Sequence, residues 1–189
     1  MTNFDAAYSY GAYEGTLREL IHLFKYDGIA PLAKPLGDLM AAALPTHLRF
    51  DVIVPMPLHW LRHWRRGFNQ SELLAKEVSR RLGIPVVKAV RRKRSTSTQT
   101  GLSPHQRRLN VAGAFAQRRW PEAKIKGSSI LLVDDVLTTG ATVSACAAAL
   151  KKAGARQVTV LSLARADRRA ADSPRDGASE AFTASVRRG

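Results

Sequence analysis

Apolar side chains follow a helical spacing in the first quarter of the chain. Between Leu17 and Phe24 they recur every three or four residues, and Asp27-Gly28 ends the run, which predicts an amphipathic helix. A second helix is expected from Pro31 to Leu44. Residues 1–45 are therefore predicted to form a helical N-terminal part.

A strand and a helix are predicted next. Asp51–Val54 is a short apolar run that leads into Pro55–Pro57, which is typical of a buried strand entering a constrained loop. Asn69 stands at an N-cap position with Glu72 three residues later, a capping-box pattern. The helix that it opens is expected to end at Gly83, because glycine readily takes the left-handed conformation after a helix.

The second half of the chain continues the alternation of strands and helices. Arg91 to Asn110 is polar and basic and is predicted to be a long loop. The other expected elements are strands at Ile84–Val90, Val111–Phe115, Ser128–Val133 and Val158–Leu163, and a helix at Ala141–Ala153. This order indicates an α/β fold with a mainly parallel central sheet flanked by helices. One domain over residues 1–165 is expected, followed by a poorly ordered tail at 166–189.

Composition adds constraints on partners and location. The chain has 189 residues, 45% of them hydrophobic, and a formal net charge of +15, so anionic partners are expected, either phosphorylated metabolites or nucleic acid. Its one cysteine, Cys146, excludes a disulfide within the chain and is predicted to be a small packing residue. No apolar run is long enough to span a bilayer and no signal peptide is recognisable, so no membrane insertion and a cytoplasmic location are expected.

The segment from Ile130 to Thr142 carries the most specific chemistry. A buried strand is followed at once by Asp134 and Asp135, at the edge where open α/β sheets bind ligands. A small, hydroxyl-rich turn then runs into a helix; its residues are Thr138, Thr139, Gly140, Ala141 and Thr142. Backbone N–H groups and the helix dipole suit a phosphate there, while the carboxylates suit neighbouring hydroxyl groups or a divalent ion.

The alternative is an ordinary strand-to-helix connection with an Asp-Asp turn, but all positions agree with a ligand site. The segment resembles the signature of type I phosphoribosyltransferases, which binds 5-phosphoribosyl-1-pyrophosphate (PRPP). The resemblance implies that Asp134 and Asp135 hold the ribose hydroxyls and that Thr138–Thr142 wraps the 5-phosphate. It also implies Mg²⁺, bound mostly by PRPP and water near the two acids rather than by side chains.

A narrower resemblance covers roughly residues 8 to 165. The run from Asp51 to His59, Arg62, and the RGFNQ element from Arg66 to Gln70 resemble the ComF family of competence-associated, phosphoribosyltransferase-like proteins. Gln99, Leu102, Arg107, Asn110, Val111 and Phe115 fit it as well. The resemblance implies a type I phosphoribosyltransferase fold with a long mobile loop and a small N-terminal hood, and a role in DNA uptake.

Two loops are expected to complete the site. The first is the pyrophosphate loop, for which the candidates are Pro55, Met56, Pro57, Arg62, Arg66, Asn69 and Gln70. The second is the mobile loop, with candidates Arg91, Arg94, Gln99, Arg107 and Asn110. Arginine offers paired donors to phosphate oxygens, so Arg66, Arg94 and Arg107 are the candidate catalytic residues. The alternatives are a solvated basic surface or a nucleic-acid contact surface.

Three functions remain open from the sequence. One is transfer of phosphoribosyl from PRPP to an unidentified nitrogen acceptor. Another is PRPP sensing without catalysis, with single-stranded DNA on the basic face and a partner in the competence machinery. A third is purine or pyrimidine salvage, for which the N-terminal helix with Lys25 and Tyr26 would supply the hood. Many ComF-like proteins begin with a four-cysteine zinc module, and this chain has one cysteine only.

Overall fold

The central sheet of this computed structural model is parallel, as predicted. The structure describes residues 2–57, 68–92, 115–117 and 122–166. Within them the main sheet contains β1 (Ala6–Ala12), β2 (Val52–Pro55), β5 (Ser129–Leu137) and β6 (Gln157–Arg165). The strands lie in the order β1-β6-β5-β2, and every neighbouring pair is parallel.

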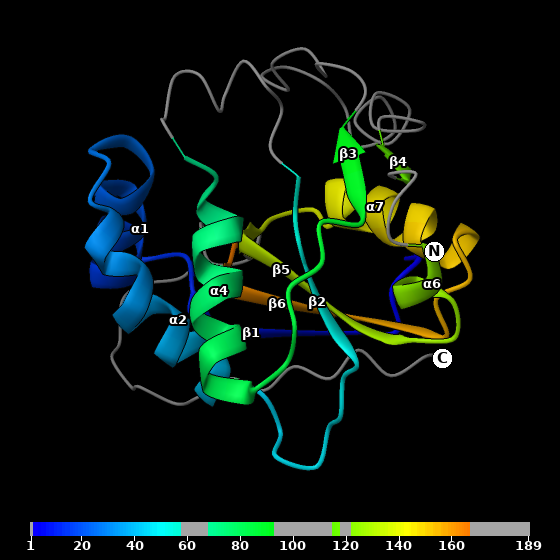
Figure 1. The fold of residues 1–189 in the computed structure, drawn as a ribbon. Coiled ribbons are helices and arrows are strands. Elements are labelled where there is room, and N and C mark those ends of the chain that lie inside the picture. Colours follow the sequence, from blue (N-terminus) through cyan, green and yellow to red (C-terminus); the bar gives the residue numbers. More distant parts are fainter. Residues whose placement is uncertain (1, 58–67, 93–114, 118–121, 167–189) are drawn as a thin grey trace.

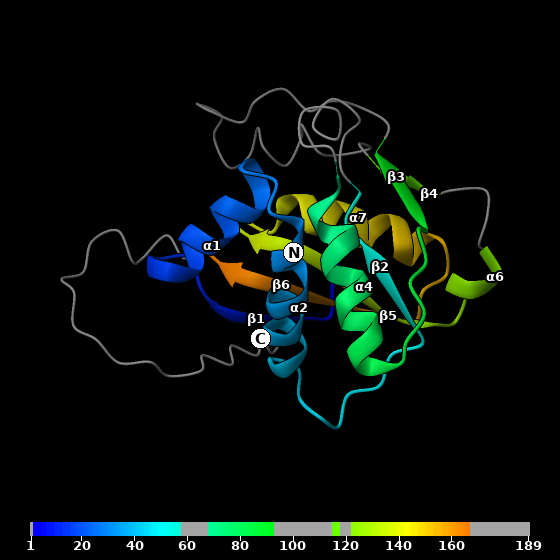
Figure 2. The ribbon, with the colours of Figure 1, turned by 60° about the vertical axis from the view of Figure 1, so that its left-hand side comes forward.

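Helices cover both faces of this sheet (Figures 1 and 2). They are α1 (Gly15–Tyr26), the 3-10 turn η1 (Ala30–Leu32), α2 (Ala33–Ala42), α4 (Gln70–Leu82), the short α6 (Glu122–Ile125) and α7 (Ala141–Lys152). In Figure 1 α1, α2 and α4 lie on one side of the sheet and α7 on the other. None of the helices in the described part of the chain is long and apolar enough to cross a membrane.

Alternation along the strands builds two cores. In β5, Ile130 and Leu132 pack into the core on the α7 side, whereas Leu131 and Val133 pack into the core beneath α1, α2 and α4. All four side chains are fully buried. A strand buried on both faces reads as a continuous apolar run, which is why this strand was predictable from its sequence.

Local signals fix the ends of α4. Asn69 caps its N-terminus, because the side-chain Oδ1 accepts a hydrogen bond from the Ser71 N–H at 3.1 Å. Gly83 ends the helix in the left-handed conformation, with φ of 70°. The Glu72 carboxylate accepts a hydrogen bond from Lys88 Nζ at 2.6 Å, which ties the start of α4 to the chain that follows it.

Helices α2 and α4 are in close contact through a glycine. Gly37 in α2 is buried, and a Cβ atom at this position would stand far inside van der Waals contact with Glu77 Cβ in α4. The contact is with a Cβ atom, which a change of side-chain rotamer cannot move away. Gly37 therefore sets how close the two helices lie.

The structure corrects the predicted strands at two places. β1 was not predicted, yet it pairs with β6 along its whole length, from Ala6 opposite Thr159 to Ala12 opposite Arg165. Ile84–Val90 was predicted to be one strand, but Val86 makes an isolated bridge to Ile53 of β2 and only Val90 lies in a strand, as the first residue of β3 (Val90–Arg92). Pro85 has no N–H to donate, so a regular ladder cannot extend through it.

A second, two-stranded sheet lies against α7. It consists of β3 (Val90–Arg92) and β4 (Phe115–Gln117), which are antiparallel. Arg91 was expected in a loop but lies in β3, opposite Ala116, because pairing with β4 extends the ordered backbone that far. The expected return strand at Val111–Phe115 begins at Phe115, and residues 111–114 lie outside the described residues.

Candidate functional site

The candidate site lies at the carboxyl end of β5. The sequence predicted that Asp134 and Asp135 follow the strand, but β5 continues to Leu137, where it still pairs with Arg165 of β6. The two acids are therefore part of the sheet, and their backbone is held by it. Parallel pairing with β6 fixes this position more firmly than a turn would.

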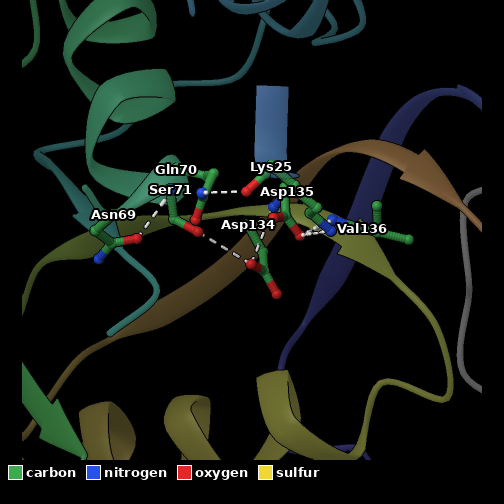
Figure 3. Close-up of polar contacts among 7 residues, drawn as sticks. All are labelled: Lys25, Asn69, Gln70, Ser71, Asp134, Asp135 and Val136. Carbon is green, nitrogen blue, oxygen red and sulfur yellow. Dashed lines mark hydrogen bonds and ion pairs between the residues drawn. The ribbon is translucent and has the colours of Figure 1, made fainter. Parts of the chain in front are cut away.

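Asp134 is anchored by two donors to one oxygen. Its Oδ1 accepts hydrogen bonds from Ser71 Oγ at 3.1 Å and from the Asp135 N–H at 2.9 Å (Figure 3). Ser71 lies in the first turn of α4, so the helix and the strand meet at this carboxylate. Burial, and then the neighbouring Asp135 charge, raise the pKa of Asp134 from 3.8 to about 7, against the opposing effects of Lys25 and the two hydrogen bonds.

Asp135 binds a lysine from the N-terminal helix. Its Oδ1 lies 2.9 Å from Lys25 Nζ, and the Lys25 and Asp135 side chains are only 13% and 15% exposed. The same Oδ1 accepts a hydrogen bond from the Val136 N–H at 2.6 Å. Figure 3 shows how α1, α4 and β5 converge on the two carboxylates.

The predicted phosphate turn follows the acids directly. Thr138 and Thr139 are exposed, and Gly140 has φ of 72° at the N-cap of α7. The Ala141 N–H donates weakly to Thr139 Oγ1 at 3.5 Å. A hydroxyl-rich turn at the start of a twelve-residue helix is suited to an anion, because the helix N-terminus carries unpaired N–H groups and a positive dipole end.

The described part of the predicted pyrophosphate loop is tied to the sheet. Pro55 is the last residue of β2 and is paired with Val133, and the N–H of Met56 donates to the carbonyl of Val133 at 2.8 Å. Met56 is buried in the core on the α7 side, and Pro57 is partly buried. The Asn69 amide donates to the Met56 carbonyl at 3.1 Å, which brings the two ends of the loop together. A role of Pro55, Met56, Pro57 and Asn69 in binding pyrophosphate stays a prediction.

Several predicted residues have other positions or lie outside the described ranges. Gln70 is buried, and its amide donates to the Lys25 carbonyl at 3.5 Å. The Arg91 side chain is exposed. The candidates outside the described residues are Arg62, Arg66, Arg94, Gln99, Arg107 and Asn110.

Sequence reasoning missed the contacts that two residues make in the site. Lys25, which the sequence indicated only as part of a possible hood, contacts Asp135, and Ser71 contacts Asp134 from a separate helix. Ser71 lies two positions after a recognisable N-cap, so its place in the first turn of a helix near a sheet edge was a usable signal. Lys25 is more than a hundred residues from its partner, and no local pattern links the two.

Cys146 is a packing residue, as predicted. It is fully buried in α7 within the core on that side of the sheet. Burial, and then the Asp134 charge, raise the pKa of its thiol well above the ordinary range. The thiol therefore stays protonated and is a poor nucleophile.

The raised pKa of Asp134 predicts a pH-dependent stability. Between about pH 4 and pH 7 the folded protein holds a proton that the unfolded chain releases, so Asp134 makes the fold less stable as the pH rises through this window. Asp134→Asn is neutral throughout and keeps an Oδ1 acceptor for Ser71. We expect it to raise the free energy of unfolding by about 1–2 kcal/mol at pH 8, because the shift sets an upper limit near 4 kcal/mol that solvent at this edge reduces.

Urea denaturation of the wild type and the variant at pH 5 and pH 8 measures this effect. The rise in the free energy of unfolding should be much smaller at pH 5, where the wild-type Asp134 carboxyl is mostly protonated and is also neutral. Asp38→Asn, on the exposed side of α2, is the matched control and should show no such contrast. An equal gain at both pH values would contradict the assignment of this titration to Asp134.

Comparison with known proteins agrees with the geometry. Residues 69–185 match the family described as phosphoribosyl transferase domain. Competence protein F of Haemophilus influenzae is 36% identical to this chain over 167 residues, which cover 82% of this chain and 71% of that protein. The chain belongs to the ComF family. DNA utilization protein YhgH of Escherichia coli is 40% identical over 160 residues, covering 81% of this chain and 69% of that protein.

More distant similarities support the same fold. Competence protein ComFC of Bacillus subtilis is 31% identical over 148 residues, and the chain spans 54% of that protein. The solved structure of glutamine PRPP amidotransferase from B. subtilis matches with a TM-score of 0.50 and 21% identity, covering 76% of this chain and 30% of that chain. That likeness concerns the fold alone. The expected type I phosphoribosyltransferase fold is thereby confirmed for this ComF-family chain.

Proposed function

We propose that this ComF-family protein binds PRPP with Mg²⁺ at the carboxyl end of β5 and transfers its phosphoribosyl group to a nitrogen acceptor. One observation carries the proposal. Asp134, Asp135 and the turn before α7 lie in unbroken succession at one edge of a parallel sheet. The two carboxylates can accept two hydroxyl groups, and the adjacent helix N-terminus can bind a phosphate. A ribose 5-phosphate carries its hydroxyl and phosphate groups in the same order.

The free oxygens of the acids support binding of a diol. Both Oδ1 atoms accept bonds from within the protein. No group in the described ranges donates to either Oδ2 atom. Two vicinal hydroxyls would satisfy these oxygens through charge-assisted hydrogen bonds, which are among the stronger polar contacts.

The proposed reaction exchanges one bond at the anomeric carbon. The bond between C1 and the pyrophosphate oxygen breaks, and its electron pair leaves with pyrophosphate. The lone pair of the acceptor nitrogen forms the new bond to C1, and the nitrogen releases one proton to water or to the leaving group. The protein holds the reactants in place and balances charge, so it needs no side-chain nucleophile.

The residues present fit a magnesium ion carried by the substrate. Among the described residues no group of three or more His, Cys, Asp or Glu is placed to hold a metal. Two adjacent carboxylates nevertheless provide the hard oxygen donors that suit Mg²⁺ near bound phosphate, directly or through water. When bound, the ion would neutralise charge on the departing pyrophosphate.

The relatives suggest where such a protein acts. Two of them are named competence proteins and one a DNA utilization protein. We propose a cytoplasmic role in the use of DNA taken up by the cell, with single-stranded DNA as a partner of the basic chain, whose net charge is +15. A PRPP sensor without turnover would share the same ligand site.

Isothermal titration of the wild type with PRPP and Mg²⁺ tests the ligand. We expect a dissociation constant between about 1 μM and 1 mM, the range in which the Michaelis constants of enzymes commonly fall. Ribose 5-phosphate should bind more weakly, because it lacks pyrophosphate, and omission of Mg²⁺ should weaken PRPP binding. Absence of binding by folded protein would overturn the proposal. Pyrophosphate release with a panel of amines and nucleobases then separates a transferase from a sensor.

A further inference from the structure

Lys25 connects the N-terminal helix to the two acids. It lies in the last turn of α1, and its ammonium group is 2.9 Å from Asp135 Oδ1 while its side chain is only 13% exposed. Burying a lysine is unfavourable unless a partner offsets the loss of hydration. The ion pair with Asp135 offsets the lost hydration of the Lys25 ammonium, and it does so at the edge of the sheet that carries the two acids.

The helix that carries Lys25 is anchored independently. The neighbouring Phe24 is fully buried, and its ring centroid lies 5.7 Å from that of Phe68, just before α4. Ile21, one turn earlier, is fully buried as well. The Gln70 amide holds the Lys25 carbonyl. Apolar packing therefore already holds α1 in place, and the ion pair is not needed for that purpose.

The geometry of Asp135 indicates what Lys25 does. The ammonium and the Val136 N–H both bind Oδ1, so the carboxylate is fixed with one oxygen turned into the protein. Asp134 is fixed in the same way by Ser71 and the Asp135 N–H. Each acid is therefore held through its Oδ1 atom, and its Oδ2 atom receives no donor from the described residues.

We propose that Lys25 is a positioning residue of the ribose site, which acts through Asp135 and makes the N-terminal helix part of PRPP binding. The inference rests on the proposed function. The ammonium fixes Asp135 so that Oδ2 can accept a ribose hydroxyl, and it offsets one negative charge where an anionic ligand must approach. It does not compete with the ligand, because it binds the other oxygen.

Charge balance supports this role. Asp134 and Asp135 are adjacent acids, and PRPP brings further negative charge into the same place. Among the described residues, Lys25 is the cation that forms an ion pair with one of these acids. Its charge counters the burial and the Asp135 charge that raise the pKa of Asp134. Without Lys25, the negative charge of the acids would be uncompensated and would repel the phosphates more strongly.

The test is a titration of PRPP with Mg²⁺ into Lys25→Met, which keeps much of the side-chain volume but removes the charge. We expect binding about ten times weaker than in the wild type. Lys25→Arg retains the charge and should recover most of the affinity. Lys34→Met, at an exposed lysine of α2 that pairs with Asp38, is the matched control and should bind like the wild type.

A double-variant cycle separates positioning from mere anchoring of α1. If Lys25 acts through Asp135, Lys25→Met should weaken PRPP binding much less in the Asp135→Asn background than in the wild type. Losses that multiply, or Lys25→Met binding within a factor of two of the wild type, would overturn the inference while PRPP binding stands. If the wild type itself does not bind PRPP, the proposed function fails and the inference with it. If Lys25→Met does not fold, Lys25→Arg and Asp135→Asn are compared instead. Lys25→Arg keeps the charge, so a loss of affinity as large as that of Asp135→Asn would contradict a positioning role for Lys25.

Discussion

Replacing both acids, as Asp134→Asn with Asp135→Asn, should weaken PRPP binding at least about 100-fold. Each carboxylate is expected to accept a hydroxyl through a charged hydrogen bond worth about 1.5–3 kcal/mol, so the pair accounts for several kcal/mol. The asparagine Oδ1 atoms can still accept from Ser71 and from the backbone N–H groups that now bind the aspartates. The loss should therefore come from the ligand contacts rather than from a change of fold.

Calorimetry under the conditions used for the wild type measures the loss, and circular dichroism checks that the fold is kept. The Asp38→Asn variant removes a carboxylate from the exposed side of α2 and should bind like the wild type. If the double variant binds PRPP within a factor of three of the wild type, the ribose does not lie at these acids. The motif would then serve a structural purpose.

Gly37→Ala is expected to destabilise the fold by about 2–3 kcal/mol. The new Cβ would overlap Glu77 Cβ of α4, and overpacking of this kind commonly costs about 1–3 kcal/mol. A small gain in helix propensity of up to about 1 kcal/mol works against this loss. Because α4 also holds Ser71 at Asp134, a displaced helix should weaken PRPP binding as well.

Urea denaturation of Gly37→Ala, Glu77→Gly and the combined variant measures the overlap. Glu77→Gly removes the Cβ that the alanine would meet, at a cost of about 1 kcal/mol for glycine inside a helix. The combined variant should then be nearly as stable as Glu77→Gly alone. Costs that simply add would mean that the cost of the alanine does not come from its contact with Glu77 and that Gly37 does not set the distance between the helices.

Local patterns account for the parts of the fold that the sequence predicted. β5 was predictable because its apolar run serves two cores, and α4 because Asn69 and Gly83 mark its ends. The acids and the turn before α7 are contiguous, so one stretch of sequence contains them. The strand was predicted too short, because Asp134 and Asp135 look like a strand end although pairing with β6 continues past them.

Features that depend on distant pairing were not predictable in the same way. β1 has the sequence AAYSYGA, whose alanine, glycine and serine give little strand signal, and only β6 makes it a strand. Ile84–Val90 looks like a strand by composition, yet Pro85 limits its pairing with β2 to one bridge, and Val90 pairs with β4 instead. The ion pair between Lys25 and Asp135 joins residues that no spacing rule connects.

The pairing of β1 with β6 also fixes when the protein can mature during its synthesis. The first strand of the chain must wait for a partner that begins at Gln157, and the partner lies between β1 and the rest of the sheet. At a typical rate of translation the wait is on the order of ten seconds. Throughout that time the N-terminal helices have been synthesised, but the sheet that they cover still lacks β6. A chain that ends just before β6 would therefore contain every residue of the candidate site, but it would lack the strand that pairs with the end of β5 carrying Asp134.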